Sequence, residues 1–307
     1  MGKLFHALEA QQFDRPWLEE EFFPLVAKME TAAKRGGNNG LTGKGMISFF
    51  EEPSTRTRAS FEIAMKKSGG DVIFSTENAL EFSSRAKGET IEDTIQVLCG
   101  YGPDVIVYRS RDEGMVKRAA ACSRVPIINA GDGPEEHPTQ GLLDLYTIKK
   151  EKGRIDGISI AMCGDLAMGR TVRSLVHLLT KFSGVRIHFV SPKVVSIRND
   201  IRKELEGHKV WFSEFDDLKK AAPLADVIYQ TRIQKERGSI VPRYGQEFFR
   251  ITQEILDLMK KDAIVMHPLP RVDEISLEVD NDPRAAYFRQ AENGLYVRMA
   301  LLKMILD

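Results

Sequence analysis

The chain has 307 residues, and its 44 Lys and Arg balance 44 Asp and Glu, so its formal net charge is zero. Charged residues make up 29% and hydrophobic residues 42%, values of a folded globular protein rather than a disordered chain. A neutral total disfavours general nucleic-acid binding, although it can conceal a local basic pocket. No apolar run approaches the roughly 20 residues that a membrane-spanning helix needs. The length indicates about two domains.

Cysteine usage and the N-terminus both favour a reduced, cytoplasmic protein. The three cysteines, Cys99, Cys122 and Cys163, include no CxxC pair, so neither a disulfide framework nor a zinc site is expected. The first residues lack the apolar core of a signal peptide and soon become acidic.

In the first half of the chain, short apolar runs alternate with helical patterns. We expect the apolar runs to be strands buried on both faces of a parallel sheet. The expected strands are Met46–Phe50, Val72–Ser75, Val105–Tyr108 and Ile127–Asn129. The expected helices are Arg56–Ser68, Glu89–Cys99 and Gly114–Cys122.

The second half repeats this alternation. The expected strands are Ile158–Cys163, Val185–Val190, Val210–Phe212, Val227–Gln230 and Ala263–Met266. The expected helices are Thr171–Lys181, Ile197–Glu206 and Thr252–Lys260. Two longer helical patterns, Thr139–Lys152 and Ala285–Leu306, complete the chain, and the first of them is expected to bridge the halves. The pattern predicts an α/β protein with two doubly wound parallel-sheet domains joined by bridging helices.

Ligands of open parallel sheets bind beyond the carboxyl ends of the strands, so the residues that follow each expected strand are candidates for chemistry. After the first strand, residues 54–58 read Ser-Thr-Arg-Thr-Arg and lead into a helix, with Ser54 as the expected N-cap. Helix-start N–H groups, hydroxyls and two arginines favour a phosphate site over a merely capped helix.

Further candidates follow the later strands. Arg109 follows the third strand, and His137 and Gln140 stand three residues apart at the start of the bridging helix. A metal site at 135–137 is not expected without a second nearby His or Cys. Residues 164–170 lack the G-x-G-x-x-G spacing of a dinucleotide loop, so Arg170 is interpreted as an anion contact.

Four arginines therefore follow strand ends: Arg56, Arg109, Arg170 and Arg232. Together they indicate a ligand with several negative charges, and we expect the balancing acidic residues to be spread over the rest of the chain. No nucleophilic triad or metal cluster is visible, which favours catalysis by positioning and electrostatics. Near the last strand, two prolines flank Leu269 and fix the backbone, so that carbonyl groups point outward as acceptors.

Taken together, these motifs resemble the transcarbamoylases, and within that family the aspartate type. The similarity extends over nearly the whole chain. The matching segments are residues 54–58, 87–90, 137–140, 164–165 with 169–171, 231–237 and 267–271. The TRIQKER and HPLPR segments distinguish the aspartate type from the ornithine type, which typically has an SMG segment and a cysteine in HCLP.

The resemblance implies transfer of a carbamoyl group from carbamoyl phosphate to L-aspartate, the committed step of pyrimidine synthesis, with no cofactor and no metal. It implies a carbamoyl-phosphate-binding domain at 1–134 plus 292–307 and an aspartate-binding domain at 135–291. The phosphate would be held by Ser54, Thr55, Arg56, Thr57 and Arg109. The carbamoyl group would be held by His137, Gln140, Thr57 and Arg109. Aspartate would be bound by Arg170, Arg232, Gln234 and the carbonyl groups of Pro268 and Leu269.

The resemblance also implies a homotrimer with shared sites, because a loop of the neighbouring subunit would contribute Ser83 and Lys87. Many relatives have Lys-Lys-Gly-Glu in that loop, whereas this chain has Ala86 before Lys87, with Arg85 beside it. One cation is thus missing from the pattern. Whether a regulatory chain also binds is left open, since some family members attach one and others are bare trimers.

Two other interpretations remain at this point. An ornithine-type enzyme would be separated by an acceptor assay that compares aspartate with ornithine. A Rossmann-like anion-binding protein without catalysis would be separated by titration with NAD against carbamoyl phosphate. Nucleic-acid binding is disfavoured, because the arginine motif has no interleaved aromatic residues.

Overall fold

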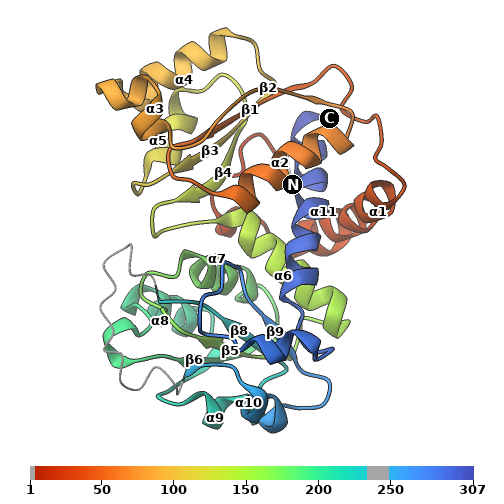
Figure 1. Cartoon of the computed structure of the whole chain (residues 1–307), viewed down its shortest axis with the longest axis vertical. Coiled ribbons are helices and arrows are strands. Elements are labelled where there is room, and N and C mark those ends of the chain that lie inside the picture. Colours follow the sequence, from red (N-terminus) through yellow and green to blue (C-terminus); the bar gives the residue numbers. More distant parts are fainter. Residues whose placement is uncertain (1–3, 234–248) are drawn as a thin grey trace. The chain divides into compact units, whose positions relative to one another are not determined.

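Two α/β units form the part of the chain that the computed structural model describes, residues 4–233 and 249–307. Unit 1 is Met1–Leu142 with Asn293–Asp307, and unit 2 is Leu143–Glu292. Helix α6 (Pro138–Lys152) leads from unit 1 into unit 2, and helix α11 (Tyr287–Leu306) leads back (Figure 1). Both bridging patterns in the sequence are thus single helices.

Unit 1 contains a parallel sheet in the order β2-β1-β3-β4. Its strands are β1 (Gly45–Phe50), β2 (Asp71–Thr76), β3 (Val105–Ser110) and β4 (Ile127–Asp132). Its helices are α1 (Phe23–Lys34), α2 (Thr55–Lys67), α3 (Ala79–Phe82), α4 (Ile91–Gly100) and α5 (Met115–Cys122). Helices α4 and α5 cover one face through Ile95 and Val116, which pack with Ile106 of the sheet. On the other face, the Arg298 guanidinium of α11 lies over the Phe61 ring of α2 at 5.0 Å.

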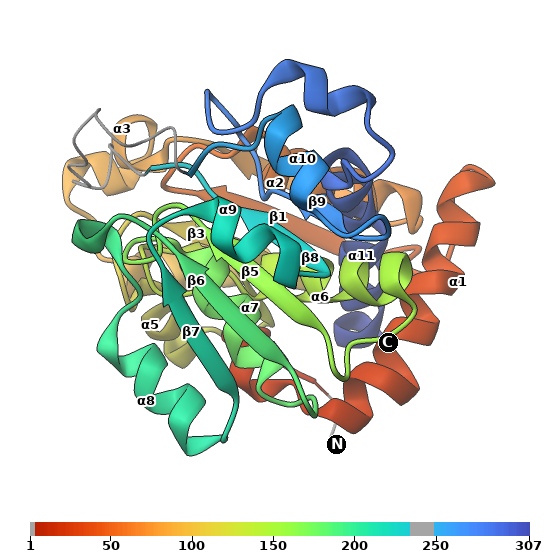
Figure 2. The same ribbon diagram turned by 90° about the horizontal axis from the view of Figure 1, so that it is seen from below.

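Unit 2 contains a parallel sheet in the order β7-β6-β5-β8-β9. Its strands are β5 (Ser159–Cys163), β6 (Arg186–Val190), β7 (Trp211–Phe215), β8 (Val227–Gln230) and β9 (Ile264–Met266). Its helices include α7 (Arg170–Leu179), α8 (Asn199–Gly207), α9 (Leu218–Ala221) and α10 (Gln253–Leu258). Helices α7 and α8 lie on one face of the sheet and α9 and α10 on the other (Figures 1 and 2). The chain order reverses between β5 and β8, the kind of place where such sheets bind ligands.

The expected strands form, but two are not buried on both faces as predicted. Strand β2 is largely exposed, with Ile73 and Phe74 each 46% exposed, and β7 is also only partly covered. Both are edge strands that other elements leave partly uncovered, whereas the edge strands β4 and β9 are buried. An apolar run does not reveal which elements will cover it.

The N-terminal region forms helical structure that the sequence patterns above did not predict. A π-helical stretch, Trp17–Phe22, continues into α1. Val26, Met29 and Ala33 of this helix are buried within unit 1. Among the described residues, no helix is long and apolar enough to cross a membrane.

Candidate active site

The residues predicted to bind an anion in unit 1 lie near the carboxyl ends of β1 and β3. Arg109 is the penultimate residue of β3 rather than the residue after it, and it pairs in register with Phe50 of β1. Its buried side chain places Nη2 2.5 Å from Glu52 Oε2, while Nη1 donates to the carbonyl oxygen of Ala130 at 3.1 Å. The guanidinium is therefore held in a fixed orientation beside the loop that leads into α2.

Residues 54–58 lie at the N-terminus of α2, as predicted, with Ser54 in the N-cap position. The Ser54 side chain makes no capping hydrogen bond with the described residues. Its backbone N–H instead donates to Glu77 Oε1 at 2.6 Å, and Arg58 Nη2 lies 3.3 Å from the other Glu77 oxygen. The Glu77 carboxylate thus contacts both the N-cap residue and the first turn of α2. Thr57 is buried, whereas Arg56 is exposed at this helix start.

His137 and Gln140 are brought to the same edge of the unit 1 sheet. The Asp132 N–H of β4 donates to the Glu136 carbonyl at 2.9 Å, which places His137 beside the end of β4, the neighbour of β3. His137 and Gln140 are both buried, and the Gln140 N–H donates to the His137 carbonyl at 2.9 Å. The Thr139 hydroxyl lies 3.5 Å from His137 Nδ1, an arrangement that suits a ring protonated on Nε2.

Acidic residues share this basic site, contrary to the expectation that they are spread elsewhere. Glu52 contacts Arg109, Glu77 contacts Arg58, and the buried Glu51 contacts Arg85. Buried or half-buried cations need a counter-charge, and these carboxylates supply it. The patterns considered in the sequence did not single them out, although the pair 51–52 adjoins the motif at 54–58.

In unit 2, hydrogen bonds join the carboxyl ends of β5 and β8. Thr231 follows β8, and both its N–H (2.7 Å) and its hydroxyl (3.0 Å) donate to the carbonyl oxygen of Cys163 in β5. Arg232 comes next along the chain. Arg170 is the first residue of α7, at a helix start as predicted, and it is buried. Gln234 lies outside the described residues.

The turn after β9 is set by a buried histidine. His267 Nδ1 accepts the Leu269 N–H at 2.7 Å, so the ring proton resides on Nε2, which donates to Glu274 Oε1 at 2.7 Å. Burial tends to raise the pKa of Glu274, but the hydrogen bond from His267, helped by backbone N–H donors, outweighs it, and this pKa lies below its usual value. Leu269 has a positive φ of 56°. The bond to His267 holds the carbonyls of Pro268 and Leu269 in one arrangement.

Ser83 and Lys87 lie in a short loop of unit 1. The Ser83 hydroxyl donates to the Ala79 carbonyl at 2.6 Å, and Lys87 is exposed at the end of a 3₁₀ turn, Ser84–Lys87. Within residues 4–233 and 249–307, no group of three or more His, Cys, Asp or Glu side chains is arranged to hold a metal ion. Burial raises the pKa of the Cys163 thiol, which is the opposite of what an activated nucleophile needs.

Comparison with known proteins places this architecture in a family of two-domain transferases. Residues 6–150 match the carbamoyl-P binding domain of aspartate/ornithine carbamoyltransferase, and residues 156–305 match its Asp/Orn binding domain. The chain therefore belongs to the aspartate/ornithine carbamoyltransferase family.

Several similar proteins are of the aspartate type. Aspartate carbamoyltransferase 1, chloroplastic, of Pisum sativum is 53% identical over 99% of this chain and 79% of its own length. The catalytic subunit of Methanocaldococcus jannaschii aspartate transcarbamoylase superposes with a TM-score of 0.90 at 45% identity, covering 99% of this chain and 98% of that one. The Trypanosoma cruzi enzyme, solved with carbamoyl aspartate and phosphate, gives a TM-score of 0.90 at 38% identity, over 99% and 96% of the two chains. The predicted α/β fold and the predicted aspartate carbamoyltransferase function are both confirmed.

Proposed function

We propose that this chain joins carbamoyl phosphate and L-aspartate to give N-carbamoyl-L-aspartate and phosphate by holding carbamoyl phosphate on unit 1 and aspartate on unit 2. The observation that carries the proposal is the buried Arg109, fixed at the sheet edge beside the N-terminus of α2 and the His137 segment. That arrangement supplies donors to both a phosphate and an adjoining carbonyl group. In the Trypanosoma cruzi relative, structures contain carbamoyl phosphate, aspartate and the product.

On unit 1, the phosphate is held by the first turn of α2. Ser54, Thr55, Arg56 and Thr57 present hydroxyl, guanidinium and helix N–H donors there, and the positive end of the helix dipole adds to them. The carbamoyl carbonyl oxygen is bound by Thr57, Arg109 and His137, and Gln140 binds the carbamoyl amino group.

The reaction needs charge stabilisation rather than a protein nucleophile. The neutral aspartate amine attacks the carbamoyl carbon, a C–N bond forms, and negative charge develops on the carbonyl oxygen as the intermediate becomes tetrahedral. Arg109 and a neutral His137 that donates from Nε2 stabilise that oxygen. The C–O bond to phosphate then breaks, Arg56 stabilises the leaving group, and the phosphate accepts the amine proton.

On unit 2, the substrate is a dicarboxylate with an amine. Arg170, Arg232 and Gln234 bind its two carboxylates, because a guanidinium matches a carboxylate with two parallel donors. The outward carbonyls of Pro268 and Leu269 accept amine hydrogens. The His267–Glu274 contact supports this role, since it fixes the turn that carries both carbonyls.

We further propose a homotrimer in which Ser83 and Lys87 complete the neighbouring subunit's site. Support comes from the exposed apolar residues at the β2 edge of unit 1, Ile73 and Phe74, and from Phe82, which is 77% exposed next to Ser83. Burial of such a patch against another copy gives a hydrophobic driving force for assembly. Light scattering measures the mass, and a monomer at assay concentration contradicts this proposal.

The activity is tested by a product assay with aspartate and, separately, ornithine as the acceptor. We expect carbamoyl aspartate to form and carbamoyl ornithine not to form. His137→Ala is expected to lower kcat by about 10²–10³-fold, the usual effect of removing a donor to a developing oxyanion. Arg56→Ala is expected to cause a comparable loss. Unchanged turnover in His137→Ala would refute the role given to that residue.

The shared site has a separate test. Lys87→Gln and His137→Ala are each expected to have strongly reduced activity alone, since each impairs every site of its own trimer. Dissociation and reassociation of a mixture should restore activity, because some hybrid sites then contain both native residues. If the mixture stays inactive while hybrid trimers form, Lys87 does not act across the subunit boundary.

We also propose a cytoplasmic location, based on the three cysteines, which are all free thiols in the structure. The Pisum sativum relative is chloroplastic. Fractionation of the source cells with an antibody against the chain distinguishes the two locations, and recovery in an organelle fraction would contradict this proposal. The same extract, sized with and without salt washing, shows whether a regulatory chain accompanies the trimer.

A further inference from the structure

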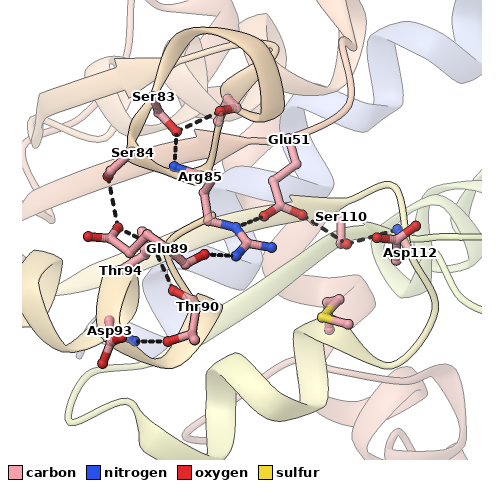
Figure 3. Close-up of polar contacts among 12 residues, drawn as sticks. Glu51, Ser83, Ser84, Arg85, Glu89, Thr90, Asp93, Thr94, Ser110 and Asp112 are labelled. Carbon is pink, nitrogen blue, oxygen red and sulfur yellow. Dashed lines mark hydrogen bonds and ion pairs between the residues drawn. The ribbon is translucent and has the colours of Figure 1, made fainter. Parts of the chain in front are cut away.

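The loop that carries Ser83 and Lys87 is anchored to the end of β1 by a buried ion pair. Glu51 directly follows β1, and its side chain is only 1% exposed. Arg85 lies in the middle of the loop with a side chain 15% exposed, and its Nε donates to Glu51 Oε1 at 2.6 Å (Figure 3). The two residues are 34 positions apart in the chain, so this contact links separate segments of unit 1.

Each member of the pair is engaged on its other side as well. The Ser110 hydroxyl at the end of β3 donates to Glu51 Oε2 at 3.1 Å, and the same oxygen of Ser110 accepts the Asp112 N–H at 3.0 Å. Arg85 Nη1 donates to the backbone carbonyl of Glu89 on the far side of the loop. A continuous chain of hydrogen bonds therefore connects β3, β1 and both ends of the loop (Figure 3).

The loop has further internal bonds that keep its shape. The Ser83 hydroxyl accepts the Arg85 N–H at 3.1 Å. The Glu89 carboxylate accepts hydroxyl donors from Ser84 at 2.8 Å and from Thr94 at 2.6 Å. Together with the Glu51 contact, these bonds hold the loop between Ser83 and Glu89, and Lys87 projects from it as an exposed cation.

We propose that Glu51 and Arg85 are positioning residues that set the placement of Ser83 and Lys87, and that Arg85 does not replace the lysine absent at Ala86 as a substrate-binding cation. The Glu51 side chain is only 1% exposed, so moving the Arg85 guanidinium to a substrate anion would leave a buried carboxylate without its counter-charge. The Arg109 contact is different, because the Glu52 side chain is 24% exposed and water can solvate it when an anion takes its place. The Arg85 guanidinium thus stabilises the loop, and within residues 83–89 Lys87 is the cation that binds the substrate. The part of this inference that concerns substrate rests on the function proposed above.

Amide hydrogen exchange tests the anchor without any assay of activity. The amides of Ala86, Gly88 and Glu89 are bonded within the loop, to Ser83 (3.0 Å), Arg85 (3.1 Å) and Ser84 (3.3 Å). In both Glu51→Gln and Arg85→Gln, we expect these amides to exchange at least about tenfold faster than in the native protein. Arg118→Gln is the control, because Arg118 makes an exposed two-pronged contact with Glu92 on neighbouring helices. It should leave the loop exchange unchanged.

Kinetics test the link to the active site. Glu51→Gln and Arg85→Gln should each lower kcat/KM for aspartate by about 10–100-fold through misplacement of Lys87. The double variant should be no worse than either single one, because both remove the same contact. Compared with Arg85→Gln, Arg85→Lys should keep part of the activity and part of the exchange protection. A lysine ammonium can contact Glu51 but cannot also reach the Glu89 carbonyl as the Arg85 guanidinium does.

The outcomes separate the competing explanations. If Arg85 instead bound substrate, Arg85→Gln would lose activity with normal loop exchange, and Glu51→Gln would stay active. Native exchange rates in both glutamine variants would overturn the anchor itself. If the native protein did not carbamoylate aspartate, the proposed function would fail, yet the exchange experiment would still decide the anchor.

Discussion

Gly164 offers a sharp test of how the unit 2 site is built, through the substitution Gly164→Ala. Gly164 follows β5 with φ at +117°, a region that residues with a side chain rarely adopt. A Cβ added there would lie 2.6 Å from the Thr231 hydroxyl and 2.9 Å from its carbonyl carbon, with the carbonyl oxygen closer still. Those backbone atoms precede Arg232, so a methyl group must push the β8 end away from β5.

The expected cost has two parts. Strain from the unfavourable φ contributes about 1–3 kcal/mol. Crowding of a well-packed contact contributes about 1–3 kcal/mol more. The sum of about 2–6 kcal/mol is a large share of the roughly 5–15 kcal/mol that stabilises a typical protein. A shift near 1 Å at Thr231 would also misplace Arg232 and lower kcat/KM for aspartate by about 10²-fold.

Urea unfolding and steady-state kinetics on the same preparations measure both effects. Gly207→Ala is the matched control, because Gly207 ends α8 and a Cβ there meets no described atom within 4 Å. It should raise the free energy of unfolding by about 0.4–1 kcal/mol. A Gly164→Ala variant with native stability and native KM for aspartate would refute the idea that the Gly164–Thr231 contact places Arg232.

Three further predictions concern buried carboxylates of unit 2. The Glu274 carboxylate accepts three hydrogen bonds, from His267 (2.7 Å), Val272 (3.0 Å) and Asp273 (3.1 Å), and Glu274→Gln replaces one of its two acceptor oxygens by a donor NH2 group. The variant should cost about 2–3 kcal/mol in urea unfolding and raise KM for aspartate. Exposed Glu278→Gln should change stability by less than about 0.5 kcal/mol. The pKa of Glu274 is lowered in the folded state, so its stabilising contribution is present above the unfolded pKa of about 4.3 and is lost as pH falls through the folded pKa. The difference in unfolding free energy between the native protein and Glu274→Gln should therefore narrow below about pH 4.5. A constant difference down to about pH 3 would contradict this. Tyr229→Phe removes the donor to Asp144 Oδ2 (2.7 Å) and should lower the unfolding free energy by about 1.5–3 kcal/mol, whereas an unchanged midpoint would show that the bond contributes nothing net.

Local patterns in the sequence predicted the sheets well and their edges badly. The run Val105–Tyr108 forms the central strand β3, in which every residue is buried. The run at 72–75 looks equally apolar, yet it forms the exposed edge strand β2. Burial depends on which strands come to lie beside it, and that is decided by packing elsewhere in the chain. The N-terminal helix was missed although Val26, Met29 and Ala33 carry the required spacing.

The same distinction applies to the candidate site. Rules about strand ends located Arg109, His137 and Arg170, because the position of a residue after or near a strand is a local property. The carboxylates that hold these groups were not located. Glu52 meets Arg109 and Glu51 meets Arg85 only after the sheet of unit 1 has formed, and no spacing along the chain encodes those contacts.

Charge balance is also found at the candidate site itself. The basic residues of unit 1 do not form a bare cationic pocket; Arg109 and Arg58 each already contact a carboxylate, from Glu52 and Glu77. An anion that approaches Arg109 must compete with Glu52 at 2.5 Å, so part of its binding free energy goes into displacing or sharing that contact. In return, the guanidinium is already oriented before the anion arrives, and little reorganisation is left for the reaction. The carboxylates at the strand ends thus weaken the net attraction for an anion but keep the arginine side chains in a fixed orientation for binding it.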